Sequence, residues 1–350
     1  MKYSIIIPVF NRPDEVEELL SSLEHQQRTD FEVIVVEDGS TISCKEVCLK
    51  HSQKLAVHYY EKSNSGPGQS RNYGVERANG EWIIILDSDV VVPSGYLEAI
   101  DGELESGQPT DAFGGPDRAS DTFSPKQKAI SYSMTSFFTT GGIRGGRRKL
   151  DRFYPRSFNM GIRKEAFLAL KGFSNMRFGE DIDFSIRVYK AGYRCRLFPQ
   201  AWVWHKRRTD FKKFWKQVFN SGIARINLYK KYPESLKLVH LLPAVFTIGL
   251  ALLALLFLFG AAILTIGNTP VQQSPGFSAC CIGLGLPTAY ALLILTDALL
   301  RTRSLGTSLL AVASSFIQLT GYGTGFLSAM WKRMVLQRGE YHAYDKTFYD

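Results

Sequence analysis

Two aspartates, Asp87 and Asp89, stand one residue apart directly after Glu81–Leu86, a run with the character of a buried strand. Two carboxylates at a strand end can hold one hard cation that also bridges two phosphate groups. Such a cation offsets the negative charge that develops on a nucleoside-diphosphate leaving group. The triplet Asp87-Ser88-Asp89 also fits a solvated turn with a helix cap, so the neighbouring segments have to decide between the two interpretations.

Two further polar segments carry side chains that suit a nucleotide. Asp38, in Glu37-Asp-Gly-Ser40, can accept the imide hydrogen of uracil, and it can also cap the helix that follows. In Gly66-Pro-Gly-Gln-Ser-Arg71 the glycines let the backbone approach phosphate, and Arg71 can contact a base or a diphosphate. A structural ion pair is the alternative for Arg71. The segment is not a P-loop, because it lacks Gly-Lys-Ser/Thr.

A regular alternation of strand and helix patterns separates these polar groups. We expect strands at Ser4–Val9, Phe31–Val36, Leu55–Tyr60 and Glu81–Leu86, and helices at Asp14–Leu23, Cys44–His51 and Gln69–Ala78. This alternation predicts an α/β fold with a parallel sheet and right-handed crossovers. Ligands of such sheets bind at the carboxyl ends of the strands, where the polar groups fall.

The pattern loosens between Gly114 and Arg163, where residues 141–148 read as a basic, glycine-rich loop. Short elements then return. We expect helices at Ala166–Leu170 and Asp181–Ala191, and strands at Arg194–Phe198 and Ala201–Trp204.

Four motifs come in a fixed order: Ile5-Ile-Ile-Pro8-Val-Phe-Asn11, Glu37-Asp-Gly-Ser40, Gly66-Pro-Gly68-Gln-Ser-Arg71-Asn72 and Leu86-Asp-Ser-Asp89. Their order and spacing resemble family 2 glycosyltransferases with the GT-A (Rossmann-like) fold, over roughly residues 1–230. The resemblance implies that the acid before Gly-Ser binds the base and that the paired aspartates contact ribose and metal. It also implies an inverting reaction. The implied nucleotide-sugar contacts from these motifs are Pro8, Asn11, Asp38, Gly68, Arg71, Asp87 and Ser88, with Asp87 and Asp89 at the metal.

The resemblance also implies a catalytic pair, Glu180-Asp181, on the acceptor side of the site. An inverting transfer needs one base to take the proton from the attacking hydroxyl. Asp181 is the candidate base, with Glu180 in support. A helix cap is the alternative for Asp181, and Asp183 and Arg187, four residues apart, fit a structural ion pair.

Two more residues lie where relatives place parts of the donor site. His205, after Trp202-Val-Trp204, matches a third metal ligand, because a neutral imidazole can complete a site that Asp89 begins. A packed histidine is the alternative. Asn159, in Phe158-Asn-Met-Gly161, resembles the segment that lines the donor sugar.

One departure from the motifs of this family bears on the product of the reaction. Processive members carry a Gln-x-x-Arg-Trp motif after the catalytic base, whereas this chain reads Gln217-Val-Phe-Asn-Ser-Gly-Ile-Ala-Arg225. The missing Arg-Trp pair argues against extrusion of a long polymer and favours a single transfer. Gln217 and Arg225 remain candidates for contacts with the diphosphate or the acceptor.

The last third of the chain has long uncharged stretches, residues 238–296 and residues 304–331, without Lys, Arg, Asp or Glu. We expect membrane spans at about 241–266, 280–300 and 305–330, since about 20 apolar residues cross a bilayer. Gly321, Gly323 and Gly325 leave open a re-entrant hairpin in place of the third span. Residues 1–230 then form the catalytic domain, 238–331 the transmembrane region and 332–350 a polar tail.

Charge supports the same organisation. The 350 residues have 42 Lys and Arg against 33 Asp and Glu, a net charge of +9. The basic residues cluster at 144–163 and 206–237, as expected next to anionic headgroups, and the helix expected over Phe211–Tyr229 would lie in the interface. The basic flank predicts that the catalytic domain lies in the cytosol. The protein itself is expected in the inner membrane, which its chain crosses more than once. No nucleic-acid motif accompanies the charge.

The five cysteines, without a CxxC pair, predict reduced thiols and neither a disulfide framework nor a zinc site.

Together these features predict an inverting glycosyltransferase that uses Mn²⁺ or Mg²⁺ and moves one sugar to a lipid-linked or membrane-proximal acceptor in cell-surface glycan synthesis. The expected donor is a nucleotide-diphospho-sugar, with UDP favoured by Asp38. Two alternatives stay open. One is a polyprenyl-phosphate glycosyltransferase, and the other is a membrane scaffold that binds nucleotide-sugar without turnover.

Overall fold

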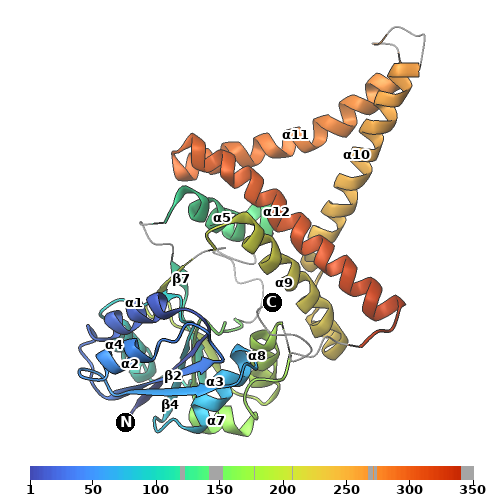
Figure 1. The fold of residues 1–350 in the computed structure, drawn as a ribbon. Coiled ribbons are helices and arrows are strands. Elements are labelled where there is room, and N and C mark those ends of the chain that lie inside the picture. Colours follow the sequence, from blue (N-terminus) through green and yellow to red (C-terminus); the bar gives the residue numbers. More distant parts are fainter. Residues whose placement is uncertain are drawn as a thin grey trace. The chain divides into compact units, whose positions relative to one another are not determined.

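The computed structural model describes residues 1–118, 123–141, 153–176, 178–206, 208–266, 271 and 274–339. It divides into two compact units (Figure 1). The first contains the described residues up to 118 and from 153 to 206, and the second contains the described residues 123–141 and those from 208 onward. Most of the basic loop expected at 141–148 and the end of the polar tail lie outside the described residues.

The first unit is built on a seven-stranded sheet in the order β3-β2-β1-β4-β8-β6-β9. Its strands are β1 (Tyr3–Val9), β2 (Phe31–Asp38), β3 (Val57–Lys62), β4 (Trp82–Leu86), β6 (Ala112–Gly114), β8 (Asn159–Arg163) and β9 (Cys195–Leu197). The first four are parallel to one another, as expected from the alternation of strands and helices.

The sheet is mixed beyond these four strands, because β8 runs antiparallel to both β4 and β6. Asn159 opens β8 opposite Leu86, which closes β4. The chain therefore enters β8 from the edge of the sheet at which β4 ends. A strand that starts at that edge must run antiparallel to its neighbour, so no crossover helix is needed here.

Helices cover both faces of this sheet and bury its alternate side chains. On one face lie α1 (Pro13–Leu23), α2 (Lys45–His51) and α4 (Tyr96–Glu105), packed on the odd-numbered side chains of β1. On the other lie α3 (Pro67–Glu76), α7 (Lys164–Ala169) and α8 (Glu180–Lys190), with Ile6 and Ile34 between them and the sheet. The period-2 alternation of the strands supplies both cores.

A second, three-stranded sheet has the order β5-β10-β7, from β5 (Val90–Val91), β10 (Val203–His205) and β7 (Asp117–Arg118). His205 pairs with Val90, and the amide of Lys206 donates to the carbonyl of Asp89 at 3.0 Å. This small sheet therefore brings a distant part of the sequence to the end of β4.

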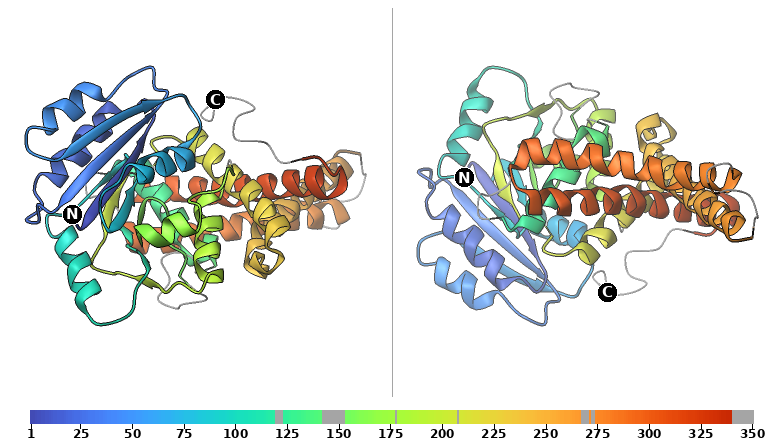
Figure 2. Two further views of the ribbon diagram at one scale, coloured as in Figure 1. Left: turned by 90° about the horizontal axis from the view of Figure 1, so that it is seen from below. Right: turned by 90° about the horizontal axis from the view of Figure 1, so that it is seen from above.

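The second unit is helical. Its helices are α5 (Pro125–Thr135), α6 (Phe137–Thr140), α9 (Phe211–Lys231), α10 (Leu242–Ile266), α11 (Pro275–Thr302) and α12 (Leu305–Met330), with short turns at Pro233–Ser235, Leu238–His240 and Trp331–Val335. Helices α5 and α6 fall in the stretch whose sequence pattern is loose. Helices α11 and α12 lie against each other through Ile294, Ala298 and Ala311 (Figure 2).

Glycines set the close approach of these helices. A Cβ atom on Gly325 would lie 2.0 Å from the carbonyl oxygen of Phe219, and one on Gly222 would lie 2.2 Å from that of Tyr322, so α9 and α12 touch backbone to backbone. Gly323 faces Pro243 of α10 in the same way. Helix α12 continues unbroken through its glycines, so they pack helices together and no re-entrant hairpin forms there.

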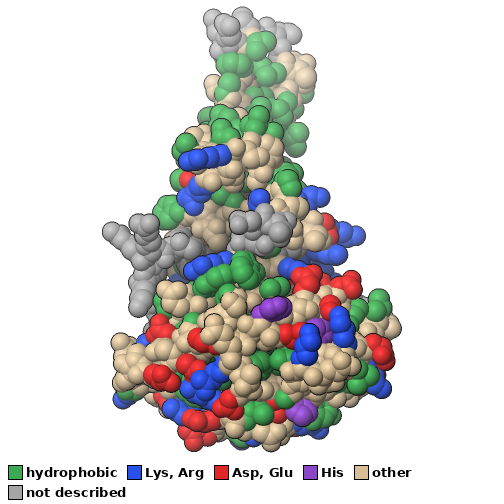
Figure 3. All heavy atoms as spheres, turned by 90° about the vertical axis from the view of Figure 1, so that its left-hand side faces the viewer, with side chains coloured by type: hydrophobic (Ala, Val, Ile, Leu, Met, Phe, Trp, Pro, Cys, Tyr) green, Lys and Arg blue, Asp and Glu red, His purple; other side chains and the backbone are tan. Residues whose placement is uncertain are grey.

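Two helical segments, Leu238–Ile266 and Pro275–Thr302, are long and apolar enough to cross a membrane, by length and composition. Large apolar side chains on α10 and α11 are exposed, and Figure 3 shows hydrophobic side chains on this part of the surface. Helix α12 is not one of the two segments, and several of its serines are buried.

Helix α9 was expected to present its apolar face to the membrane interface. Its buried Phe214 and Val218 instead pack with Ile130 and Met134 of α5 and with Ile317 of α12. This part of the apolar face of α9 is therefore covered by protein within its own unit, whereas Trp215 is 38% exposed.

Candidate functional site

Three side chains that could bind a metal meet at the carboxyl end of β4. One ligand atom from each of Asp87, Asp89 and His205 lies within 4.8 Å of the other two. The first two follow β4 directly, and the pairing of β10 with β5 brings in the third, whose Nε2 lies 3.2 Å from an oxygen of Asp89. The ring of His205 stacks on Phe158 at 4.9 Å, which fixes its orientation.

The donor set fits a hard divalent cation. Two carboxylates and an imidazole offer oxygen and nitrogen ligands, and these atoms lie within 4.8 Å of one another. The Nδ1 atom of His205 is buried and has no hydrogen-bond partner among the described residues. An imidazole with an unused ring nitrogen can present either tautomer to a metal.

Arg71 joins this triad to the second pair of acids. It is 3% exposed, and its guanidinium donates to Asp87 at 2.7 Å and to Glu180 at 3.2 Å. The alternative assigned to Arg71, a structural ion pair, is thus present, but the pair lies inside the candidate site. One side chain links the strand that ends in the paired aspartates to the helix that begins with Glu180.

The two acids of α8 have opposite electrostatics. Burial, with the charge of Asp181, raises the pKa of Glu180 to about 7 against the pull of Arg71. Burial alone would also raise the pKa of Asp181, but the charge and hydrogen bond of Arg156 outweigh it and hold that pKa below its usual range. Arg156 Nε lies 2.5 Å from Asp181. Asp181 is therefore ionised at neutral pH, while Glu180 exchanges a proton near pH 7.

Asp38 has a different environment from the one expected for a base-binding acid. It is fully buried, and its oxygens accept hydrogen bonds from the backbone amides of Ser65 and Gly66 and from the ammonium of Lys62. These bonds tie the end of β2 to the loop that precedes α3. Contact with a base remains a prediction for Asp38.

Four other predicted donor contacts lie at this edge of the sheet. Pro8 is buried in β1 opposite Val36, beyond the last pairing of β1 with β4, so its missing amide hydrogen costs no bond on that side. Asn11 adopts a left-handed φ of 54° and accepts from the amides of Thr41 and Ile42.

The other two of these residues pack closely. A Cβ atom on Gly68 would lie 3.3 Å from Cγ of Glu180, so the glycine lets α3 approach the acid pair. Ser88 is buried between the two aspartates.

The remaining predicted residues have other surroundings. Asn159 is buried, donates to the carbonyl of Ala201 at 2.8 Å and accepts from the hydroxyl of Tyr96 at 2.7 Å. Its amide therefore holds protein segments together in this structure. Gln217 and Arg225 belong to α9 of the second unit, and their part in the site remains a prediction.

Sequence reasoning missed two arginines of the site. Arg12 donates to Asp89 at 2.6 Å, and Arg156 donates to Asp181. Arg12 lies three residues after the end of β1, at the correct edge of the sheet, which was a usable signal. Arg156 comes from the loosely patterned stretch, where nothing in the sequence marked it.

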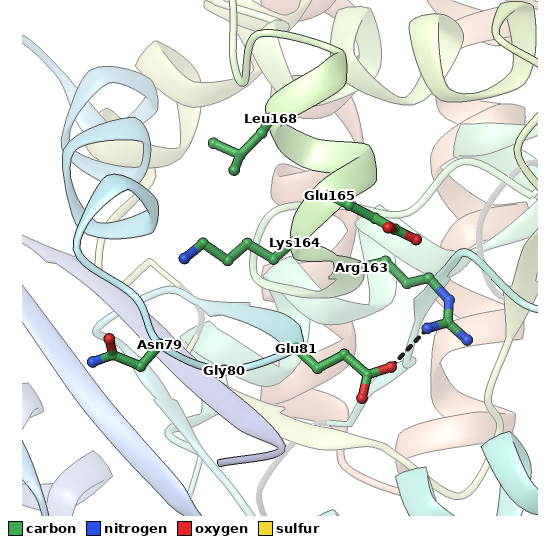
Figure 4. A pocket seen from close by; sticks show the side chains of 7 residues that line it. All are labelled: Asn79, Gly80, Glu81, Arg163, Lys164, Glu165 and Leu168. Carbon is green, nitrogen blue, oxygen red and sulfur yellow. Dashed lines mark hydrogen bonds and ion pairs between the residues drawn. The ribbon is translucent and has the colours of Figure 1, made fainter.

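A surface cavity of about 420 Å³ lies elsewhere (Figure 4). It is lined by Asn79, Gly80, Glu81, Arg163, Lys164, Glu165 and Leu168. Glu81 precedes β4, whereas the acids follow it, so the cavity lies at the opposite edge of the sheet. Its charged side chains are already paired in part, with Arg163 2.7 Å from Glu81.

Comparison with known proteins identifies the N-terminal part of the chain. Residues 4–170 match the family model for glycosyl transferase family 2. The chain contains a glycosyltransferase family 2 domain. This result confirms the resemblance stated from the motifs, and with it the α/β GT-A fold expected for the domain.

The family 2 domain has similar regions in curated relatives. It is 40% identical over 93 residues to the poly(ribitol-phosphate) beta-N-acetylglucosaminyltransferase TarS of Staphylococcus aureus, which covers 25% of this chain and 16% of the relative. The chain is 26% identical over 242 residues to the probable glycosyltransferase YdaM of Bacillus subtilis, and the match covers 65% of this chain and 56% of that one. The chain thus spans less than two thirds of the length of either relative.

One solved structure shares the fold. A mannosyltransferase of Pyrobaculum calidifontis, in complex with GDP-Man and Mn²⁺, superimposes with a TM-score of 0.53 at 17% identity. The match covers 95% of this chain and 88% of that chain.

The raised pKa of Glu180 predicts how the stability of the protein changes with pH. A carboxyl group whose pKa rises on folding, here from 4.5 to about 7, binds more protons in the folded state between those values. Its contribution to stability is therefore lost as the pH rises through that window. We expect Glu180→Gln to gain thermal stability relative to the unmodified protein between about pH 5 and pH 8.

The measurement is the unfolding midpoint of both proteins across this pH range. Glu165→Gln, which removes an exposed carboxylate of the same unit, is the matched control and should track the unmodified protein. A constant difference between Glu180→Gln and the unmodified protein at every pH would contradict the assignment.

Proposed function

We propose that this chain is an inverting, metal-dependent glycosyltransferase that moves one sugar from a nucleotide-diphospho-sugar to a lipid-linked or membrane-proximal acceptor. The observation that carries the proposal is the bridge through Arg71, which sets a candidate metal triad and a pair of buried acids side by side. An inverting transfer needs a donor site and a base next to each other, on opposite sides of the reacting carbon.

The proposed donor site is the metal triad with its arginines. Asp87, Asp89 and His205 would hold the cation, and Arg71 and Arg12 lie beside them with charge that suits a diphosphate. When bound, a divalent cation supplies positive charge to the departing diphosphate. The assignment of Mn²⁺ or Mg²⁺ rests on the hard oxygen ligands.

The proposed base is Asp181. Its carboxylate is charged at neutral pH because Arg156 lowers its pKa, so it is available to accept the proton of an acceptor hydroxyl. A low pKa also makes it a weak base, and we propose that Arg156 withdraws from Asp181 when the acceptor binds. Glu180, paired with Arg71, orients the start of α8.

The proposed acceptor and location rest on the second unit. Two helices long and apolar enough to cross a membrane follow the domain, and their apolar side chains are exposed. An enzyme anchored in this way meets acceptors at the membrane surface. We propose that it lies in the inner membrane with the family 2 domain in the cytosol, on the evidence of the basic flank. The staphylococcal relative, which acts on a poly(ribitol-phosphate), is consistent with a product in cell-surface glycan synthesis.

A donor panel tests the reaction. Membranes that contain the protein, supplied with UDP-, GDP- or dTDP-sugars and Mn²⁺, should transfer sugar or hydrolyse one donor. Chelation of the metal should abolish turnover, and added Mn²⁺ should restore it. Asp89→Asn should lose metal-dependent turnover, while Asp111→Asn, which changes an aspartate directly before β6 and away from the triad, should retain it.

Turnover that survives chelation contradicts the metal assignment. Donor binding without transfer or hydrolysis by any member of the panel would favour the scaffold alternative.

The role of Asp181 is tested by its own substitution. We expect Asp181→Asn to lower transfer by about 100- to 10,000-fold, the usual contribution of general base catalysis. Donor binding should change little, because Asp181 is not a donor ligand in this scheme. Glu180→Gln should lower the rate of transfer by a smaller factor.

Substantial activity of Asp181→Asn would instead favour a phosphate acceptor. A polyprenyl phosphate is already ionised and needs no base.

A further inference from the structure

The two aspartates of the metal triad already have cationic partners. Asp87 accepts from Arg71 at 2.7 Å, and Asp89 accepts from Arg12 at 2.6 Å through the oxygen that does not face His205. Two carboxylates and two guanidinium groups sum to no net charge. The two guanidinium groups therefore lower the attraction of these carboxylates for a divalent cation that approaches by itself.

The two arginines differ in their freedom to move. Arg71 is 3% exposed and is also held by Glu180, whereas the side chain of Arg12 is 31% exposed. Arg12 can therefore turn away from Asp89 without opening a core. Its backbone is fixed on both sides, by the hydrogen bonds of Asn11 to the loop after β2 and by Pro13, which begins α1. The side chain alone has to move.

We propose that Arg12 is a built-in counter-ion that competes with the divalent cation for Asp89 and is released by the diphosphate of the donor. A diphosphate offers the guanidinium an anionic partner in place of the carboxylate. The metal and the nucleotide then help each other to bind, since coupling between two ligands is reciprocal. This inference rests on the proposed metal and donor site and adds its order of assembly.

Metal binding without turnover tests it. The free Mn²⁺ signal in electron paramagnetic resonance, titrated with purified full-length protein, gives the affinity with and without UDP or GDP. Without nucleotide, Arg12→Gln should bind Mn²⁺ about 10-fold more tightly than the unmodified protein, because one nearby positive charge is gone. The nucleotide should strengthen Mn²⁺ binding to the unmodified protein more than to Arg12→Gln.

Two further variants distinguish a failure of the role of Arg12 from a failure of the metal site. Arg163→Gln removes an arginine at the opposite edge of the sheet and should leave Mn²⁺ affinity unchanged. Asp89→Asn should lose Mn²⁺ binding. Equal Mn²⁺ affinity of Arg12→Gln and the unmodified protein, with Asp89→Asn defective, overturns the role of Arg12 alone. Mn²⁺ binding that Asp89→Asn leaves intact overturns the metal site itself.

An independent observation concerns α6 in the second unit. Phe137 is 65% exposed and Phe138 is 38% exposed, although this short helix is firmly attached. The hydroxyl of Tyr290 on α11 donates to the carbonyl of Phe138 at 2.9 Å. A Cβ atom on Gly141 would lie 2.9 Å from Val239, just before α10. The exposed phenylalanines thus adjoin both candidate membrane helices.

The position of this attachment along the helices indicates its depth. Tyr290 is about 22 Å from the start of α11 at 1.5 Å per residue, and Phe246, whose ring contacts it, is about 30 Å from the end of α10. The hydrocarbon core of a bilayer is about 30 Å thick. If the connection between α10 and α11 reaches the far side, α6 lies at the near boundary, where aromatic side chains are favoured.

We infer that Phe137 and Phe138 insert into the near leaflet of the membrane, an inference that rests on the proposed anchoring. Photo-crosslinking of the full chain in membranes tests it, with p-benzoylphenylalanine placed at Phe137. The positive control is the same label at Leu255 on α10, which is 62% exposed, and the negative control is Ile42 in the first unit, which is 58% exposed.

Lipid adducts at Phe137 and Leu255, detected by mass spectrometry, with none at Ile42, support the insertion. A lipid adduct at Leu255 only, or a protein adduct at Phe137, overturns it. The absence of lipid adducts at both Phe137 and Leu255 overturns the anchoring itself.

Discussion

The buried guanidinium of Arg71 is the interaction on which the arrangement of the site depends. It lies between Asp87 at the end of β4 and Glu180 at the start of α8, and it is shielded from water. Two acids brought this close repel each other unless a cation stands between them. Removing such a partner leaves buried charges uncompensated, which is far more costly than losing a surface ion pair. The close approach of α3 at Gly68 gives the same region its compactness.

The charge states of the acids are set by the neighbouring side chains rather than by the residue types. Asp181, next to Arg156, keeps its charge, whereas Glu180, with burial and a neighbouring negative charge against it, has its pKa raised to about 7. At the other end of the site, Arg12 and Arg71 neutralise the paired aspartates. Three arginines therefore face the acids that we propose for metal binding and proton transfer. Substrates and metal would have to displace or share these partners.

The helical unit is assembled by a different kind of contact. Helices α9 and α12 meet through glycines whose missing side chains allow backbone contact, and α10 and α11 meet in the same way at Gly260 and Gly276. Packing of this type does not depend on expelling water, so it suits helices surrounded by lipid. The apolar side chains that point outward on α10 and α11 are left for the bilayer under the proposed anchoring.

The sequence by itself determined the family, the first four parallel strands and the acids at their carboxyl ends, because these depend on local periodicity and on short motifs. It also placed His205 with Asp87 and Asp89, although only through the resemblance to relatives. Tertiary structure decided the direction of β8, the burial of Asp38 and Asn159, and the partners Arg12 and Arg156. It also decided that the glycines of α12 join helices. Each of these depends on contacts between residues far apart in the chain, and local patterns carry no record of such contacts.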